Sequence, residues 1–403
     1  MSRFLTYYGD DFTGSTDVME ALASHGVQTV LFTKLPTQEQ FTPFAGCEVV
    51  GLAGTSRSQT PDWMDAHLPP VFEWLKTLNG RFCHYKVCST FDSSPTIGSI
   101  GRATEIGLRA FNQDRAALVV GAPQLKRYTF ARHLFAGYRG QTYRIDRHPV
   151  MSVHPVTPME ESDVLRHLAK QTSAHVDLID VHDAATQAAA GELLLKSPGF
   201  VVGSSGVEYA LMAALKKSRS ASFVPVPKVE QMLVISGSVS PTTERQIGYA
   251  AAHGFSPLKA DALALAKGDS GKCLTEARAL MANGKTPLIY SASGPDSDQA
   301  KALKAIPNGR ETLAKTLGGI ARQLVPEFKL KRLVIAGGDT SSHALEELGI
   351  HALTMRFPHT ETPGSPLCTA RASSPDFDGL EVAMKGGQVG GDDYFVKLKE
   401  GMA

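Results

Sequence analysis

The 403-residue chain has few cysteines, no long apolar run and almost no net charge. Its five cysteines are an odd number and lie scattered, which is typical of reduced thiols rather than of a disulfide framework. The apolar runs, such as 116–120, are far shorter than the roughly 20 residues that span a bilayer. The first residues also lack the basic, apolar and small-residue order of a secretory signal. We therefore expect a soluble, cytoplasmic protein with no membrane partner.

Basic and acidic residues nearly balance, with 41 Lys and Arg against 40 Asp and Glu. This balance offers no global attraction to nucleic acid, so we expect no nucleic-acid partner. No GxGxxG follows a predicted strand, and neither HExxH nor GxSxG occurs. The segment 268–273 has only a superficial similarity to a Walker loop, because Cys273 replaces the magnesium-binding hydroxyl. We interpret it as a helix start.

Segments rich in β-branched and aromatic residues alternate with segments of helical periodicity, which predicts an α/β fold. Strands are predicted at 3–8, 28–32, 49–53, 82–87, 117–121, 176–180, 200–203, 232–235, 287–290 and 332–336. Helices are predicted at 15–25, 62–78, 97–111, 160–171, 184–195, 207–217, 242–253, 310–324 and 341–348. The last fifty residues contain many Gly and Pro and are predicted to form short strands, loops and a terminal helix.

A domain boundary is predicted between Lys216 and Val229, where the sequence is KKSRSASFVPVPKV. Its basic and serine residues precede two prolines, which neither continue a helix nor donate to a sheet. We therefore expect two domains, 1–220 and 229–403, each a largely parallel sheet flanked by helices.

Two adjacent acids follow the first predicted strand, in the turn Gly9–Gly14. Open parallel sheets bind ligands beyond the carboxyl ends of their strands, so Asp10, Asp11 and Thr13 are candidate site residues. A carboxylate there can accept a proton from a substrate hydroxyl or orient it. The alternative is a helix-capping Asp beside a turn glycine, but two adjacent acids before Phe-Thr-Gly favour a functional role.

Two further strand ends carry basic and hydroxyl residues. Arg57 lies among hydroxyl residues at 54–58 and offers a forked donor that matches a carboxylate, although a solvated loop is the alternative. Lys86 lies on a strand that ends in Ser89, Thr90 and Asp92. Such a density of polar groups suits a polyhydroxylated acid better than an apolar ligand, and ordinary turns are the alternative.

Three glycine-rich loops distinguish the C-terminal half, at 235–243, 336–342 and 385–391. Small residues at a strand-to-helix turn let backbone N–H groups approach a phosphate, helped by the helix dipole. One such loop is usually only a turn, but three favour a ligand that carries phosphate. The candidate residues are Ser236, Ser238, Gly337, Gly338, Asp339, Thr340, Ser341, Gly386 and Gly387.

The stretch 144–155, RIDRHPVMSVHP, contains Arg144, Arg147, His148 and His154. These side chains can serve an anionic ligand, but a satisfied polar loop is the favoured interpretation. We predict no metal site there.

Together these stretches resemble the four-carbon acid sugar kinase family, formerly a domain of unknown function (DUF1537). The matching blocks are GDDFTGSTD, GTSRS, KVCSTFDSSPTIGSIG, HPVTPMEESDVLRHLAKQT, SGSVSPTTERQI, AGGDTSSHALEELGI, PGSPL and MKGGQVGG, which run from residue 9 to 391. The resemblance implies an N-terminal substrate domain and a C-terminal nucleotide domain. It also implies ATP-dependent phosphorylation of tetronate-like sugar acids in the cleft between the two domains.

The resemblance places Asp10, Asp11, Arg57, Lys86, Ser89 and Thr90 around the acid, and the three glycine loops around ATP. Asp339 stands where Glu is common in the family. Tyr8-Gly9 and the stretch 144–158 resemble the branch that acts on the branched acid 3-oxo-isoapionate. Tetronate or 3-oxo-tetronate is the alternative substrate.

We therefore expect phosphoryl transfer from ATP, with Mg²⁺, to a hydroxyl of a short sugar acid. Arg57 and Lys86 are predicted to hold the carboxylate, and Asp10 or Asp11 to orient or deprotonate the hydroxyl. Two alternatives are a sugar-acid dehydrogenase that uses a dinucleotide and a non-enzymatic sugar-acid-binding protein. The sequence does not identify the metal ligands. It also leaves the oligomeric state open, with a homo-oligomer as one option.

Overall fold

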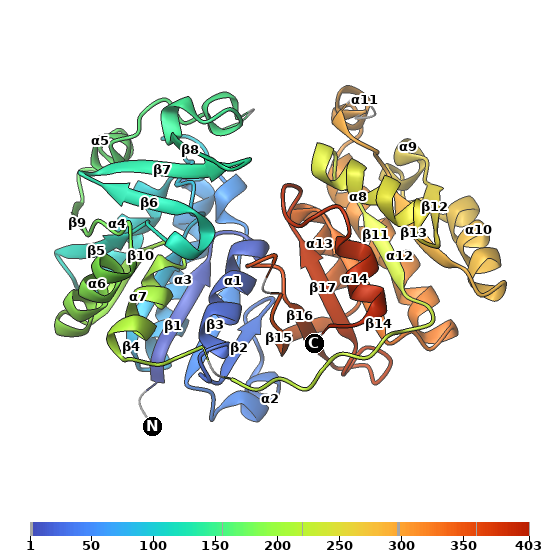
Figure 1. Cartoon of the computed structure of the whole chain (residues 1–403), viewed down its shortest axis with the longest axis horizontal. Coiled ribbons are helices and arrows are strands. Elements are labelled where there is room, and N and C mark those ends of the chain that lie inside the picture. The colour runs from blue at the N-terminus through green and yellow to red at the C-terminus, as the bar shows by residue number, and fades with distance from the viewer. Residues whose placement is uncertain (1–2, 155, 220, 296–298, 360, 403) are drawn as a thin grey trace. The chain divides into compact units, whose positions relative to one another are not determined.

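The computed structural model describes residues 3–154, 156–219, 221–295, 299–359 and 361–402. The chain divides into two compact units, Met1–Ala221 and Ser222–Ala403, which we call the N-terminal and C-terminal units. Each unit contains a mostly parallel sheet flanked by helices, as the labels in Figure 1 show. This confirms the predicted α/β fold class.

The sheet of the N-terminal unit has the order β2-β3-β1-β4-β10-β5-β9, and every neighbouring pair in it is parallel. Its strands are β1 (Arg3–Gly9), β2 (Thr29–Phe32), β3 (Val49–Ala53), β4 (Gly80–Lys86), β5 (Arg115–Val119), β9 (His175–Leu178) and β10 (Gly199–Gly203). Its helices are α1 (Phe12–Ala23), α2 (Gln38–Phe41), α3 (Pro61–Thr77), α4 (Ile100–Phe111), α5 (Val164–Ala169), α6 (Ala184–Lys196) and α7 (Gly206–Ala214). Because β2 and β3 are buried along their whole length, they read as continuous apolar runs.

The first helix begins at Phe12, three residues before the predicted start at Ser15. Asp11 has an extended backbone, and its side chain accepts a hydrogen bond from the Gly14 amide. This N-cap satisfies an amide that would otherwise lack a partner, so Phe12–Gly14 form the first helical turn rather than a loop.

A small antiparallel sheet at one end of the N-terminal unit (Figure 1) was not predicted from the sequence. It consists of β6 (Arg127–Phe130), β7 (His133–Tyr138) and β8 (Gln141–Arg144). Both hairpin turns, Ala131-Arg132 and Arg139-Gly140, have positive φ at both residues. Such turns usually carry Asn-Gly or Asp-Gly, and these sequences contain neither signal.

The sheet of the C-terminal unit has the order β12-β13-β11-β14-β17-β16-β15. Its strands are β11 (Leu233–Ser236), β12 (Phe255–Lys259), β13 (Thr286–Tyr290), β14 (Arg332–Ala336), β15 (Ile350–Phe357), β16 (Leu367–Ala372) and β17 (Glu381–Lys385). Its helices are α8 (Pro241–Ala252), α9 (Ala262–Ala266), α10 (Gly271–Ala282), α11 (Ala300–Lys304), α12 (Gly309–Glu327), α13 (Gly338–Glu347) and α14 (Tyr394–Glu400). Strands β12, β13, β11, β14 and β17 are parallel, whereas β16 is antiparallel to both β15 and β17.

Two sequence interpretations are resolved by the helices of the C-terminal unit. The Walker-like segment 268–273 leads into α10 at Gly271, which confirms that it is a helix start. Helix α13 begins at Gly338 rather than Ser341, so much of the predicted loop 336–342 is the first turn of a helix.

The sequence did not predict the strand β12, because β12 contains Pro257 and proline argues against a strand. Proline is tolerated in edge strands, and β12 is an edge strand.

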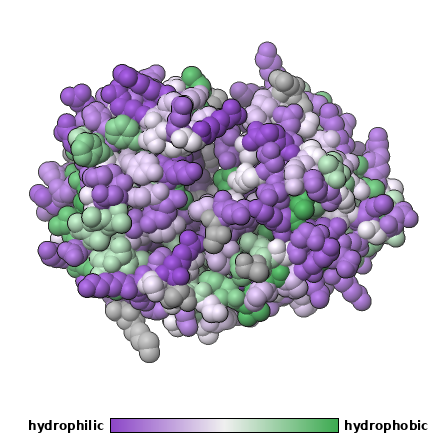
Figure 2. Space-filling view, viewed as in Figure 1, coloured by the Kyte–Doolittle hydropathy of each residue, from purple (hydrophilic) through white to green (hydrophobic). Residues whose placement is uncertain are grey.

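No helix among the described residues is long and apolar enough to cross a membrane. The face of the molecule in Figure 2 is mostly hydrophilic, with hydrophobic residues scattered over it. All five cysteines are free thiols.

A buried ion-pair network fixes the segment 224–227 to the C-terminal unit. Arg332, which is fully buried, binds Glu381 at 2.6 Å and donates to the Pro227 carbonyl at 3.1 Å. Arg356 binds the other oxygen of Glu381 at 3.0 Å and donates to the Val224 carbonyl at 2.6 Å. The two guanidinium groups thus satisfy the carbonyls of Val224, Pro225 and Pro227, whereas Val226 pairs with the backbone of Met402.

We expect Glu381→Gln to destabilise the protein by about 3 kcal/mol, because it leaves two guanidinium groups without their shared carboxylate. The measurement is the free energy of unfolding in urea. Glu327→Gln is the control, since Glu327 pairs with Arg278 on the surface and should change the free energy by less than about 1 kcal/mol. Equal effects of the two substitutions would contradict the assigned role of Glu381.

Candidate active site

The register of the N-terminal sheet places four strand ends side by side. Gly9 lies opposite Ala53 on β3 and Lys86 on β4, and Lys86 lies opposite Gly203 on β10. The segments that follow these strands are joined by backbone bonds, from the Asp10 amide to the Lys86 carbonyl at 2.9 Å and from the Arg57 amide to the Asp10 carbonyl at 3.1 Å. The structure therefore brings the acid-binding candidates of three separate loops together.

Arg57 joins two of the candidate acids. One arm of its guanidinium binds Asp11 Oδ2 at 2.6 Å, and the other binds Asp92 at 2.9 and 3.1 Å. Asp92 also accepts hydrogen bonds from the hydroxyls of Thr90 and Thr157. Burial alone would raise the pKa of Asp92, but Arg57 and the two hydroxyls outweigh it and lower the pKa to about 2. Asp92 is thus an ionised anchor for Arg57.

Asp10 and Asp11 differ sharply in their surroundings. Asp11 caps α1 and binds Arg57, and the positive charges of Arg57 and Lys86 outweigh burial and lower its pKa. The Asp10 side chain is only 4% exposed, and its Oδ1 accepts no hydrogen bond from the described residues. Burial and the negative charge of Asp11 raise the pKa of Asp10 to about 7. Asp10 is therefore the acid with a free oxygen and a pKa suited to proton transfer.

Lys86 is the last residue of β4 and is almost fully buried. Burial alone would lower its pKa, but the carboxylates of Asp17, Asp10 and Asp11 outweigh it and raise the pKa. A Cβ atom at Gly14 would lie 2.9 Å from Lys86 Nζ, so glycine at that position leaves room for the ammonium group. Asp17, on the buried face of α1, is a member of this cluster that sequence reasoning missed.

The two remaining acid-site candidates are half-buried hydroxyls. Thr13 lies in the first turn of α1, and Ser89 lies in the turn after β4. Neither side chain hydrogen-bonds to the described residues, so both hydroxyls are available to a ligand.

Phe91, in the same loop as Ser89, has a φ of 55°, which is unusual for a bulky residue and is typical of strained functional loops.

The stretch 144–155 divides into a polar loop and one site neighbour. Arg144 pairs with Asp146, and His148 accepts backbone bonds from Val150 and Met151, as the favoured interpretation of a satisfied loop predicts. His154, by contrast, accepts from the Thr157 amide, and Thr157 binds Asp92. Only the family block HPVTP could have signalled these two residues, because nothing in their local pattern distinguishes them from a loop.

Three strand ends also lie side by side in the C-terminal unit. Ser236 on β11 lies opposite Ala336 on β14, which lies opposite Lys385 on β17. The Gly237 amide donates to the Ala336 carbonyl at 3.0 Å, and the Gly337 amide donates to the Lys385 carbonyl at 2.9 Å. The three glycine-rich loops therefore begin at one edge of the sheet.

The loop after β14 passes directly into α13. Gly337 has a φ of 117°, which favours glycine, and it leaves the start of the helix without a side-chain cap. A Cβ atom at Gly237 would lie 2.2 Å from the Thr340 hydroxyl, so this hydroxyl packs against the neighbouring loop. Ser341 donates to the Gly337 carbonyl at 2.8 Å. Gly338 is exposed with open space around it, and the side chain of Asp339 lies outside the described atoms.

The third glycine loop packs on the first. A Cβ atom at Gly387 would lie 3.0 Å from Ser240 and 3.3 Å from the Ser238 hydroxyl. The Gly387 carbonyl accepts a bond from Thr243, and Gln246 holds the far end of the loop by donating to the carbonyls of Val389 and Gly391. The predicted nucleotide residues of all three loops, with Gly386 and Gly387 half-buried, thus adjoin one another.

Sequence reasoning missed one cation in this half. Lys385 was noted only as the start of a glycine loop, yet its side chain is fully buried and its Nζ donates to Thr243 Oγ1 at 2.9 Å. An apolar strand that ends in Lys followed by Gly-Gly is the only signal the sequence offers.

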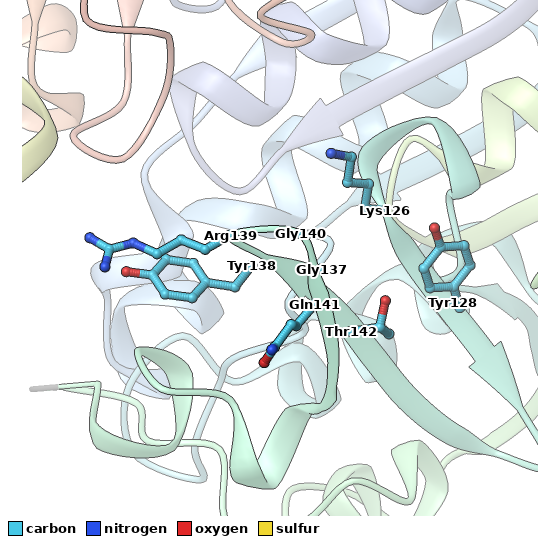
Figure 3. Close-up of a pocket in the computed structure, with 8 residues that line it drawn as sticks. All are labelled: Lys126, Tyr128, Gly137, Tyr138, Arg139, Gly140, Gln141 and Thr142. Carbon is cyan, nitrogen blue, oxygen red and sulfur yellow. The ribbon is translucent and has the colours of Figure 1, made fainter.

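A separate pocket of about 280 Å³ lies on the antiparallel hairpins. Figure 3 shows its lining residues, among them Lys126, Tyr128 and Tyr138, with the Arg139 guanidinium 5.3 Å from the Tyr138 ring. These side chains are exposed or half-buried, and none of them belongs to the two clusters above. Among the described residues, no group of three His, Cys, Asp or Glu side chains is arranged to hold a metal ion.

Two sequence models of known domains match the chain. The sequence model of a sugar-binding N-terminal domain matches residues 5–240, and that of a nucleotide-binding C-terminal domain matches residues 233–395. A 3-oxo-isoapionate kinase of Paraburkholderia graminis is 39% identical over 98% of this chain and 94% of that protein. A 3-oxo-tetronate kinase of Cupriavidus necator is 28% identical over 96% of this chain and 94% of its own length.

The fold also has a relative among solved structures. A Haemophilus influenzae protein described as DUF1537 has a TM-score of 0.70 and 23% identity, over 97% of this chain and 98% of that one. The fold and the two matched domains define a two-domain α/β protein of the sugar- and nucleotide-binding class. The chain belongs to the four-carbon acid sugar kinase family, which confirms the resemblance found in the sequence. As a kinase of this family it is a phosphotransferase that uses ATP and an alcohol acceptor, and the dehydrogenase and non-enzymatic alternatives find no support.

We expect Arg57→Met to destabilise the protein by about 2 kcal/mol near pH 7, because it leaves Asp11 and Asp92 without their shared partner. Both carboxylates have lowered pKa values, so their contribution to stability is present above about pH 4 and is lost as the pH falls toward 2. Urea unfolding of the variant and the wild type across this range measures the effect. Arg102→Met, which removes a more exposed pair with Asp65, is the control. A loss that does not shrink at low pH would contradict the network.

Proposed function

We propose that this protein transfers the γ-phosphoryl group of ATP to a hydroxyl of 3-oxo-isoapionate. In this proposal the N-terminal unit binds the acid and the C-terminal unit binds the nucleotide. The observation that carries it is the Asp10 carboxyl group, which is buried beside Arg57 and Lys86, has a free oxygen and has a pKa of about 7. The choice of acid is supported by 39% identity to a 3-oxo-isoapionate kinase, against 28% to a 3-oxo-tetronate kinase.

The acid is held by the positive charges of Arg57 and Lys86. Because Arg57 already binds Asp11 and Asp92, its forked face is not free, so it attracts the substrate carboxylate through its remaining N–H groups and its charge. Thr13 and Ser89 supply hydroxyl donors to the substrate oxygens, and the Thr90 oxygen, whose proton goes to Asp92, can accept from a substrate hydroxyl. Thr157 and His154 fix the far side of Asp92 and thereby the position of Arg57.

Asp10 accepts the proton of the attacking hydroxyl as the new O–P bond forms and the bond to ADP breaks. The two oxygens of Asp11 accept hydrogen bonds from the Gly14 amide and Arg57. Its negative charge helps to raise the pKa of Asp10. This assigns the role that the sequence left open between the two acids. Most of the catalysis still comes from positioning and charge neutralisation.

Magnesium is proposed to arrive with the triphosphate. Mg²⁺ usually binds through one or two carboxylates together with phosphate oxygens and water, so the lack of a three-ligand group among the described residues fits this arrangement. When bound, the ion neutralises charge on the phosphates. We assign no residue as its ligand.

We also propose that the reaction takes place in the cytoplasm. The support is that all five cysteines are free thiols, which suits a reducing compartment.

Asp10→Asn should lower kcat by about 100-fold or more, since it removes the proton acceptor. In the wild type, kcat/KM should fall as the pH drops below about 7, because Asp10 then becomes protonated. Asp11→Asn removes a negative neighbour, so it should move this limb to lower pH and leave measurable activity. The pH profiles of the three proteins decide the assignment. An inactive Asp11→Asn beside an active Asp10→Asn would reverse it.

A coupled assay of ADP release tests the substrate directly. With Mg²⁺ and ATP, 3-oxo-isoapionate should give the highest kcat/KM when compared with 3-oxo-tetronates and tetronates. Asp10→Asn with the same acids serves as the control for contaminating kinases. Turnover of a 3-oxo-tetronate alone would place the protein with the other branch, and no ADP release with any of these acids would refute the proposed acceptor class.

A further inference from the structure

Lys385 holds a buried position that is unusual for a lysine. It is the last residue of β17, it is 0% exposed, and its one hydrogen bond to a described residue goes to Thr243 Oγ1 at 2.9 Å. Lysine is almost never fully buried unless it is paired. A buried ammonium group without a partner disfavours folding, so a reason for this position is needed.

No ion pair between described residues includes Lys385. Lys86 also ends a strand and likewise forms no ion pair with a described residue, but the carboxylates of Asp17, Asp10 and Asp11 raise its pKa. Burial alone lowers the pKa of Lys385 to about 7, and no charged side chain of the described residues counteracts it. The groups that face it are hydroxyls from α8 and the loop before it, and the Asp339 side chain on α13 lies outside the described atoms.

The hydroxyls beside Lys385 form a chain that leads toward the glycine loops. An ammonium group only donates hydrogen bonds, so the Thr243 oxygen must accept from it. The Thr243 hydroxyl then has its own proton to give, either to Ser238 Oγ at 2.9 Å or to the Gly387 carbonyl at 3.3 Å. The shorter contact favours Ser238. A Ser238 oxygen that accepts from Thr243 and from the Ser240 amide keeps its own proton, which it can donate to a ligand.

An anion is the ligand that this arrangement suits. The chain of hydroxyls starts at Lys385, which has no ion-pair partner among the described residues, and ends at the Ser238 hydroxyl in the first glycine loop. Beside it, α13 begins without a side-chain cap, and exposed Gly338 leaves open space at that helix end. Both features offer positive charge and N–H or O–H donors, and no described side chain at either feature is a carboxylate that would bind a cation.

We propose that Lys385 is the buried counter-charge of the nucleotide's phosphates and acts through Thr243 and Ser238 as a positioning residue. The proposal rests on the proposed function, in which the C-terminal unit binds the nucleotide. It adds the source of positive charge that the glycine loops lack. In the empty protein Lys385 then has no anionic partner among the described residues, and the phosphates supply that partner when nucleotide binds.

The first test is nucleotide affinity, measured by calorimetry with ADP and Mg²⁺. Lys385→Met keeps the length of the side chain and removes the charge, and it should weaken ADP binding about 10- to 100-fold. Lys331→Met, at an exposed lysine of the same unit, is the control and should bind normally. If the wild type does not bind ADP, the proposed function fails as well. If the wild type and Lys385→Met bind equally, only this inference fails.

A double-mutant cycle tests the hydroxyl chain. Ser238→Ala should weaken ADP binding, and the double variant Lys385→Met, Ser238→Ala should be no weaker than Lys385→Met alone, because both changes interrupt one path. Independent, additive losses would show that Lys385 does not act through Ser238. Lys385→Met should weaken ADP binding by the same factor when Asp339→Asn is also present. If Asp339→Asn abolishes that loss of affinity, Asp339 is the partner of Lys385.

Two measurements separate this role from a structural one. At pH 8 the wild type should take up close to one proton as ADP binds, since phosphate favours the charged lysine, and Lys385→Met should take up none. Without nucleotide, Lys385→Met should unfold at the same temperature as the wild type or a higher one. A variant that is less stable without nucleotide would show that Lys385 is compensated within the fold and would overturn the inference.

Discussion

The compensation of buried lysine charge at the carboxyl ends of the two sheets is the constraint on which the rest of the structure depends. Lys86 ends β4 and Lys385 ends β17, and both are almost completely removed from solvent. In the N-terminal unit three carboxylates stabilise the charge of Lys86. Among the described residues of the C-terminal unit, a single hydroxyl binds Lys385. The two units therefore share an arrangement of strand ends but offer opposite electrostatic surroundings, one rich in acids and one in need of an anion.

The ionisation of the acids in the N-terminal cluster depends in the same way on neighbouring charges and hydrogen bonds. Arg57 and Lys86 together keep Asp11 and Asp92 ionised, and hydrogen bonds to Gly14, Thr90 and Thr157 occupy the oxygens of those two acids. Asp10 differs from Asp11 and Asp92 in having an unpartnered oxygen, and its pKa is about 7 because it is buried beside a neighbour that is already charged. One dipeptide thus supplies two acids with different properties, which no property of the dipeptide itself distinguishes.

The parts of the fold set by local pattern could be predicted from the sequence. The strands 49–53 and 332–336 have the predicted bounds, because an apolar run between polar turns has few other interpretations. The candidates at strand ends were named from their motifs, and parallel pairing explains why they meet within each unit. Features that depend on tertiary contacts were missed. The hairpins of β6 to β8 use left-handed Ala131 and Arg132, Thr157 reaches Asp92 from 65 residues away, and Lys385 meets Thr243 from 142 residues away.

The lack of an anionic partner for Lys385 among the described residues also bears on how long the protein survives in a cell. A ligand that binds only the folded chain stabilises it by mass action, and here that ligand would also relieve a strain already present in the resting fold. Chains that hold nucleotide would then open less often to proteases than empty ones. The amount of this protein that a cell retains would in that way follow its supply of nucleotide, without any dedicated regulatory domain.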